Sequence, residues 1–244
     1  MITLEHVDKV YKEHHALVDI NVEFPAKQTT VIVGPSGAGK STLLRSLNLL
    51  ETPNSGIYRF DKELVDFSSD LATNQILRIR RATGMVFQSW NLFPHLTILQ
   101  NITEGPVHVL GQNSQKATET ALELLHLVGL DGTEKRYPSQ LSGGQQQRIS
   151  ICRALAMNPE YLLFDEPTSA LDPELEAQVL HVLLDLAKKQ QSMIVVTHNM
   201  EFARRVADKV VFIENGEIHF DGTSEAFFNH PTRRIEAFLN GMQF

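Results

Sequence analysis

"VIVGPSGAGKST" (residues 31–42) decides the fold that this sequence predicts. A short β-branched run leads into a glycine-rich turn, and the helical pattern "LLRSLNLL" (residues 43–50) follows it. Glycines let backbone N–H groups approach phosphates closely, and the start of the following helix favours an anion. We therefore expect a phosphate-binding P-loop between a buried strand and a helix. The residues expected to hold the phosphates are Gly34, Pro35, Ser36, Gly37, Ala38, Gly39, Lys40, Ser41 and Thr42.

The strand that enters this loop, at residues 29–33, is one of four short apolar runs. The others lie at residues 84–87, 161–164 and 193–196, and near-continuous apolar runs are typical of strands buried on both faces of a parallel sheet. The N-terminal stretches instead alternate apolar and polar residues, at 2–11, 17–24 and 56–65, which indicates an antiparallel layer. The fold class is therefore α/β with a mainly parallel sheet.

Helix and turn signals lie between and after these strands. The stretch 114–130 has an apolar stripe at helical spacing with Ser114 as its N-cap, and Asp172 before Pro173 predicts the start of another helix. Asn215-Gly216 favours a hairpin with a type I′ turn. We expect one compact domain whose part near residues 90–158 is mostly helical.

Composition narrows the partners and the compartment. The chain has 244 residues and a formal net charge of −7, which argues against a nucleic-acid surface. Its single cysteine, Cys152, allows no internal disulfide or zinc cluster, and we expect a buried thiol. We see neither a signal peptide at the start nor an apolar run long enough to span a bilayer, so we expect an intracellular, soluble chain.

Polar residues that could act on a phosphate follow three of the buried runs. Asp165 and Glu166 follow "YLLF", where an aspartate can support a metal and a glutamate can orient or deprotonate a water. His198 follows "MIVVT" and Gln88 follows "GMVF", and each could reach the metal, the water or the phosphate. Taken alone, His198 would more often be a structural histidine, and Gln88 could equally be structural or functional.

A second glycine motif, "LSGGQQQRISICRALA" (residues 141–156), also precedes a helical run. Such a helix start is another anion site, but it could also be an ordinary helix N-terminus. One set of catalytic residues with two phosphate-binding motifs requires an explanation.

The order of the motifs provides one. The P-loop, Gln88, "LSGGQ", "YLLFDEP", "SALD" (residues 169–172) and His198 together resemble the ATP-binding subunit of an ATP-binding cassette (ABC) transporter, over the whole chain. "GMVFQSWNLFPHLT", "DEPTSALDPEL" and the ending "DGTSEAFFNHPTRRIEAFL" are similar to subunits for uptake of polar amino acids. "LLRSLNLLETPNSG" and "HLTILQN" are closer to the arginine type, although the glutamine and histidine types are also similar.

The resemblance implies one ABC-type ATP-binding domain over residues 1–244, with a P-loop NTPase core, an N-terminal antiparallel β subdomain and a helical subdomain near 90–158. Two copies would pack head to tail, so that "LSGGQ" of one copy binds the ATP on the P-loop of the other. The implied activity is ATP hydrolysis that powers uptake of a polar amino acid, at the cytoplasmic face of the cell membrane.

The resemblance also implies roles for single residues. ATP would contact Tyr11 (stacked on the adenine), Ala16, the P-loop, Ser142, Gly143, Gly144, Gln145 and Asp172. Mg²⁺ would be held by Ser41, Gln88 and Asp165, and the catalytic residues would be Glu166, His198, Gln88 and Lys40. A membrane permease would dock near Trp90–His95, and a solute-binding protein would act indirectly.

Several alternatives stay open at this point. The rings of Trp90 and Phe93 could pack into the helical part, and Tyr11 could be a plain edge-strand aromatic. The chain could drive transport of another solute or a lipid, act as a soluble ABC-type ATPase without transport, or be a P-loop kinase for a small molecule.

Overall fold

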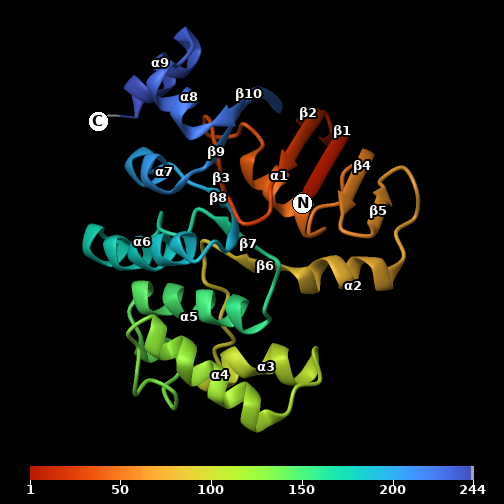
Figure 1. Ribbon diagram of the computed structural model, residues 1–244. Coiled ribbons are helices and arrows are strands. Elements are labelled where there is room, and N and C mark those ends of the chain that lie inside the picture. Colours follow the sequence, from red (N-terminus) through yellow and green to blue (C-terminus); the bar gives the residue numbers. More distant parts are fainter. Residues whose placement is uncertain (243–244) are drawn as a thin grey trace.

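Two β-sheets and the helices around them form the structure, which is a computed structural model and is described over residues 1–242 (Figure 1). The larger sheet has the strand order β10-β9-β3-β8-β7-β6. Every neighbouring pair in it is parallel except β9 and β10. Its strands are β3 (Thr29–Val33), β6 (Thr83–Val86), β7 (Tyr161–Asp165), β8 (Ser192–Val196), β9 (Lys209–Glu214) and β10 (Glu217–Thr223).

This sheet is buried on both faces, as its apolar runs predict. Along β3, Val31 and Val33 join one core cluster while Ile32 joins the other, because successive side chains point to opposite faces. The expected hairpin joins β9 to β10, with Asn215 and Gly216 at φ 52 and 81. Both positive angles agree with the predicted type I′ turn.

The smaller sheet is antiparallel and has the order β2-β1-β4-β5. Its strands are β1 (Ile2–Tyr11), β2 (His14–Phe24), β4 (Ser55–Phe60) and β5 (Glu63–Asp66). The continuous strand expected over 56–65 is therefore wrong, because the chain turns at Asp61, whose φ is 52. Aspartate tolerates this left-handed conformation better than most residues do. The predicted α/β class, with a mainly parallel sheet and an N-terminal antiparallel layer, is confirmed.

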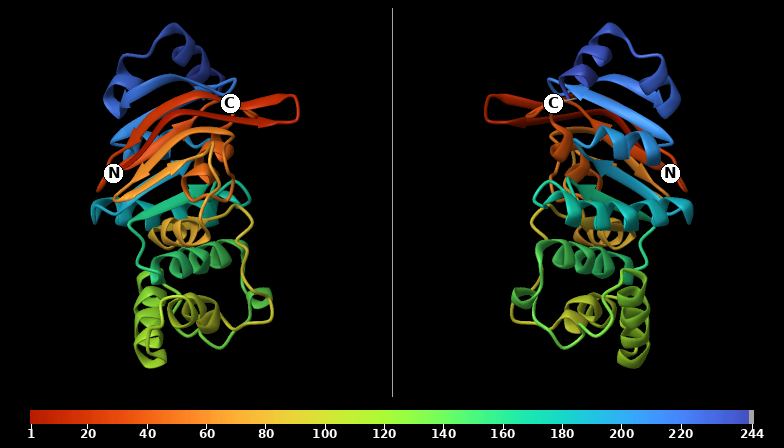
Figure 2. Two further views of the ribbon diagram at one scale, coloured as in Figure 1. Left: turned by 90° about the vertical axis from the view of Figure 1, so that its right-hand side faces the viewer. Right: turned by 90° about the vertical axis from the view of Figure 1, so that its left-hand side faces the viewer.

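Helices gather at both ends of the molecule (Figures 1 and 2). α3, α4 and α5 pack together at one end of the molecule, and α8 and α9 lie at the other end. The helices are α1 (Lys40–Leu47), α2 (Thr73–Ala82), α3 (Ile98–His108), α4 (Ser114–Leu127), α5 (Gly143–Ala156), α6 (Pro173–Lys188), α7 (Met200–Val206), α8 (Ser224–Asn229) and α9 (Arg233–Gly241), with a 3-10 turn at Pro138–Gln140.

Two predicted caps have different outcomes. Asp172 caps α6, since its side chain accepts a hydrogen bond from the Leu175 N–H at 3.0 Å. Ser114 is not the cap of α4, because Asn113 precedes it and its Oδ1 accepts from the Gln115 N–H at 2.8 Å. Asparagine competes well with serine for this position, so the error is one residue.

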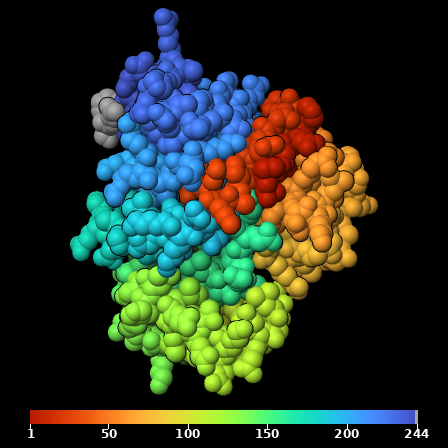
Figure 3. Space-filling view, viewed as in Figure 1, coloured from red at the N-terminus to blue at the C-terminus, as the bar shows by residue number. Residues whose placement is uncertain are grey.

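The core lies in two clusters on either side of the larger sheet. One is covered by α3–α9, and the other lies between the two sheets with α1 and α2. Cys152 is fully buried on α5, as expected, and its burial raises the pKa of the thiol to about 12. In the space-filling view the helical end forms the lower part of the molecule (Figure 3). Within residues 1–242, no helix combines the length and apolar character needed to cross a membrane.

Candidate functional site

The glycine-rich loop connects β3 to α1, as predicted. Gly39 is the N-cap of α1 with φ 99, and no side chain caps this helix. The N–H groups of the first turn of a helix lack intrahelical partners, so the start of α1 is suited to a phosphate. Position 34 accepts only glycine, because a Cβ there would lie 1.9 Å from the Ile213 carbonyl oxygen.

Lys40 is 5% exposed and lies folded back over the loop. Its Nζ donates to the carbonyl oxygens of Gly34 and Pro35, at 2.9 and 2.7 Å. Burial lowers the pKa of the ammonium, and the nearby Glu166 and Asp165 carboxylates oppose this shift. A buried cation held only by neutral carbonyl groups is a favourable partner for an anion.

Asp165 ends β7 beside the P-loop helix and is 4% exposed. Its Oδ1 accepts a hydrogen bond from the Ser41 hydroxyl at 2.7 Å. A serine hydroxyl and a carboxylate are hard oxygen donors of the type that Mg²⁺ prefers, so this pair fits the expected magnesium site. Among residues 1–242 no cluster of three or more His, Cys, Asp or Glu side chains forms another metal site.

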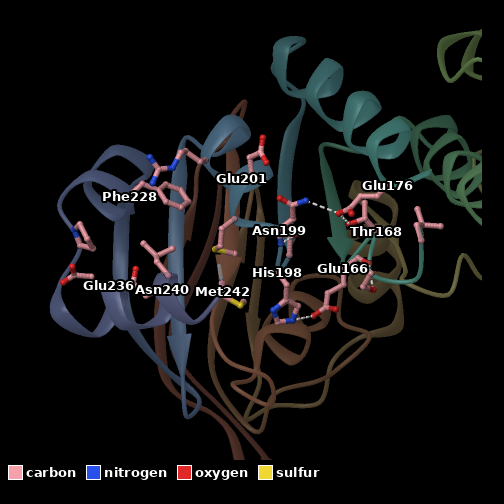
Figure 4. Close-up of a pocket in the computed structure, with 17 residues that line it drawn as sticks. Glu166, Thr168, Glu176, His198, Asn199, Glu201, Phe228, Glu236, Asn240 and Met242 are labelled. Atoms are coloured by element: carbon pink, nitrogen blue, oxygen red, sulfur yellow. Dashed lines mark hydrogen bonds and ion pairs between the residues drawn. The ribbon is translucent and has the colours of Figure 1, made fainter. Parts of the chain in front are cut away.

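Glu166 and His198 form a pair at the ends of the neighbouring strands β7 and β8. The Nε2 of His198 lies 2.8 Å from Oε1 of Glu166, so a protonated Nε2 donates to the carboxylate (Figure 4). Glu166 has φ 48, and its N–H donates to the Val196 carbonyl at 3.0 Å. A left-handed glutamate is uncommon, and such strained positions concentrate at functional sites.

A further acid, which the sequence did not single out, holds the segments after these two strands together. Oε1 of Glu176, on α6, accepts from the Thr168 hydroxyl and from the Asn199 amide, both at 3.0 Å (Figure 4). These bonds join the segment that follows Glu166 to the segment that follows His198. Two acceptor bonds from different segments are a tertiary feature that no local pattern reveals.

The P-loop and the Glu166–His198 pair line one pocket of about 350 Å³. This volume is within the usual range for small-molecule sites. Glu166 and His198 also line a larger cavity of about 880 Å³, so the two cavities share this pair (Figure 4). The residues around the smaller pocket are Tyr11, His14, Ala16, Ser36, Gly37, Ala38, Gly39, Lys40, Ser41, Thr42, Glu166 and His198.

His14 is the one member of this set that sequence analysis missed. It pairs with Tyr11 across the β1–β2 hairpin, so the register of that hairpin was the signal that could have located it. Tyr11 is 38% exposed at the end of β1, and the Lys9 ammonium lies 4.7 Å from the centroid of its ring.

The other predicted site residues lie outside this pocket. Gln88 is exposed, two residues after β6. Ser142 and Gln145 form a capping box at the start of α5, in which each side chain accepts from the backbone N–H of the other. Asp172 caps α6. One chain therefore does not bring the "LSGGQ" motif to its own P-loop pocket.

The apolar stretch at residues 90–95 lies along α5. The Trp90 ring covers Gly143, where an added Cβ would lie 3.0 Å from the ring, and Leu92 packs on the core. Phe93 remains 44% exposed. Part of the stretch is therefore packed into the helical end, and part of it stays on the surface.

Comparison with known proteins assigns the family. Residues 17–169 match the family described as ABC transporter. The chain is 51% identical over 241 residues to the glutamate transport ATP-binding protein GluA of Corynebacterium efficiens, covering 98% of each chain. It is 48% identical to the L-cystine import ATP-binding protein TcyC of Bacillus subtilis, again with 98% of each chain covered. It is 45% identical to the arginine transport ATP-binding protein ArtP of Escherichia coli, with coverage of 98% of this chain and 99% of the relative.

A solved structure agrees with the sequence relatives. The dimeric post-hydrolysis state of the ATP-binding cassette MJ0796, bound to ADP and Pi, superposes with a TM-score of 0.81 at 34% identity. The match covers 92% of this chain and 99% of that one. The chain belongs to the ABC transporter family, and it has the fold of the ATP-hydrolysing cassette of that family. The relatives do not single out arginine, since the glutamate and cystine proteins are at least as similar as the arginine protein.

Proposed function

We propose that this chain is the ATP-hydrolysing subunit of an ABC importer that takes up a polar amino acid across the cytoplasmic membrane. The observation that carries the proposal is the joint placement of Lys40, Ser41, Glu166 and His198 around one pocket. The names of the relatives, which cover glutamate, cystine and arginine transport, support the class of solute. The cassette does not need to contact the solute, so relatives with different solutes can share its sequence.

ATP binding follows from the chemistry of the pocket. The first turn of α1 and Lys40 would hold the phosphates, from Gly34 to Thr42 along the loop. The adenine would stack on the face of Tyr11 away from Lys9, with Ala16 at its edge. Mg²⁺, held by Ser41, Asp165 and Gln88, would neutralise charge that develops on the transferred phosphoryl group.

Glu166 is the proposed general base. Its carboxylate would accept a proton from the water that attacks the γ-phosphorus, while the bond from that phosphorus to the bridging oxygen breaks and releases ADP. His198 would hold the carboxylate in place through the 2.8 Å contact and would also contact the phosphate. Lys40 would stabilise the negative charge on the phosphoryl oxygens.

A second copy of the chain would complete the site. The start of α5 (Ser142 to Gln145) does not line the P-loop pocket of its own chain, but it forms a helix N-terminus that could hold the γ-phosphate of a partner's ATP. Asp172, at the end of the "SALD" segment, would also reach toward the partner. ATP would then join two cassettes, and hydrolysis would remove the joining group.

The permease would dock beside residues 90–95. Arg153, which donates to the carbonyl oxygens of Trp90 and Asn91, also lines a groove of about 260 Å³ together with Phe87 and Met157. The ring of Phe93 is exposed. Exposed apolar surface of this kind is typical of an interface. The cassette would thus act at the cytoplasmic face of the membrane, and a solute-binding protein would act only through the permease.

One experiment tests the ATP-dependent dimer. Glu166→Gln should keep ATP binding but stop hydrolysis, so light scattering should show a monomer without ATP and a dimer with it. Adding Ser142→Arg should abolish the dimer, because a bulky cation would block the helix start. Ser114→Arg, at an exposed serine at the start of a different helix, is the control. A dimer that persists with Ser142→Arg would contradict the proposed role of α5.

A further inference from the structure

The carboxylate of Asp165 has a second partner besides Ser41. Its Oδ2 accepts from Nε and Nη2 of Arg45, at 3.1 and 2.9 Å. The Asp165 side chain is 5% exposed, whereas that of Arg45 is 43% exposed. Both carboxylate oxygens are therefore bonded by groups of the same chain, one by a hydroxyl and the other by a guanidinium fork.

The sequence places both partners on one face of one helix. Ser41 and Arg45 are four residues apart in α1, so their side chains lie one turn apart on the same side. α1 packs against β7, which ends at Asp165. The helix that carries the P-loop lysine thus also carries a permanent cation directed at the expected magnesium ligand.

This arrangement has an electrostatic consequence. A buried carboxylate without a counter-charge is strongly unfavourable, and the guanidinium supplies that charge. A free divalent cation that approached Asp165 would meet a carboxylate already neutralised by a fixed cation. The triphosphate of ATP brings its own negative charge, which compensates for the cation that enters with it.

We propose that Arg45 is the built-in counter-cation of Asp165 and excludes free divalent cations, so that magnesium enters the site only together with ATP. Arg45 acts through Asp165 and is a positioning residue. The inference rests on the proposed function, because it assumes that Asp165 belongs to the magnesium site. A merely structural ion pair would affect stability without changing the metal affinity of the protein alone.

The test measures metal binding by the full chain without nucleotide. Mn²⁺ serves as the probe, and electron paramagnetic resonance reports the free and bound ion. Arg45→Met should raise the affinity for Mn²⁺ by about 10-fold or more, the scale on which groups next to a metal ligand change metal affinity. Arg45→Lys, which retains the charge, should exclude Mn²⁺ as the wild type does.

Two further variants make the result specific. Adding Asp165→Asn to Arg45→Met should remove the gained site. Arg59→Met breaks another arginine fork, to the exposed Glu5, with Nε and Nη2 at 3.0 and 3.3 Å from its oxygens. It should leave Mn²⁺ binding unchanged. Far-UV circular dichroism of every variant confirms that the fold is intact.

The outcomes separate this inference from the function on which it rests. If Asp165→Asn alone leaves binding of Mn²⁺ with ATP unchanged, the magnesium role of Asp165 is refuted. If Asp165→Asn weakens that binding but Arg45→Met gains no Mn²⁺ affinity without nucleotide, only the counter-cation role is overturned. Weaker Mn²⁺ binding by Arg45→Met would also overturn it, since Arg45 would then assist the metal.

Discussion

Arg153 on α5 secures the segment at which we expect the permease to dock. Its guanidinium donates to the carbonyl oxygens of Trp90 and Asn91, at 3.2 and 2.6 Å, and lies 5.7 Å from the centroid of the Phe93 ring. Trp90 and Asn91 have φ 58 and 49, a left-handed conformation that asparagine tolerates but that is strained for tryptophan. The helix that begins with "LSGGQ" thus holds the segment after Gln88 in a strained shape.

The cost of Arg153→Met follows from these contacts. Losing hydrogen bonds from a charged donor costs about 1.5–3 kcal/mol. Release of Trp90 from the left-handed conformation returns roughly 1 kcal/mol, whereas Asn91 tolerates that conformation and returns little. The free energy of unfolding should therefore fall by about 0.5–2 kcal/mol. For a chain of this size that is roughly 1–8 °C in the midpoint of thermal unfolding.

Function should change more than stability. Arg153→Met leaves the nucleotide pocket intact, so ATP affinity of the isolated cassette should equal that of the wild type. Assembly with the permease and permease-stimulated ATP hydrolysis should decrease, because the segment at 90–95 loses its fixed shape. Circular dichroism, nucleotide titration and co-purification with the permease measure the three effects.

Arg148→Met is the matched control. Arg148 is on the same helix and donates to the Val128 carbonyl at 2.7 Å and to the Gln178 side chain at 3.0 Å, away from residues 90–95. It should lose comparable stability yet assemble with the permease normally. Normal assembly of Arg153→Met, or an equal assembly defect in both variants, would refute the reasoning.

Two other predictions concern buried titratable groups. Lys40→Met should weaken ATP binding by about 10- to 100-fold through loss of a charged donor, and unchanged nucleotide titration would refute the P-loop assignment. Burial lowers the pKa of Lys40, and only its protonated form attracts phosphate. The affinity of the wild type for ATP should therefore fall as the pH rises, beginning at a pH below the ordinary lysine pKa of 10.5. Lys40→Met should lack this pH dependence. Burial raises the pKa of Cys152 to about 12, so only about one molecule in ten thousand should carry the thiolate at pH 8. Maleimide should therefore label the native protein at least about 100-fold more slowly than the urea-unfolded protein. Rapid labelling of the native thiol would contradict its burial.

The sequence by itself determined the features that depend on neighbours along the chain. Residues 29–33 consist of two threonines and three β-branched apolar residues, which favours a strand buried on both faces of the sheet. The spacing of the glycines that follow defines the loop. The order of Gln88, "LSGGQ", Asp165 and His198 determined the family. The Asp61 turn was missed because the alternation of residues 56–60 was extended across the three polar residues 61–63, where the chain turns.

Only the tertiary structure decided which side chains meet. Arg45 contacts Asp165, His14 joins the P-loop pocket, and Glu176 connects the segments after β7 and β8. Each of these contacts joins elements that are distant in sequence. Their geometry depends on how α1, α6 and the β1–β2 hairpin pack against the larger sheet, and the packing of distant elements is not encoded in any local period. The sequence thus names the chemistry, and the packing of the sheet and its helices sets the distances at which that chemistry can act.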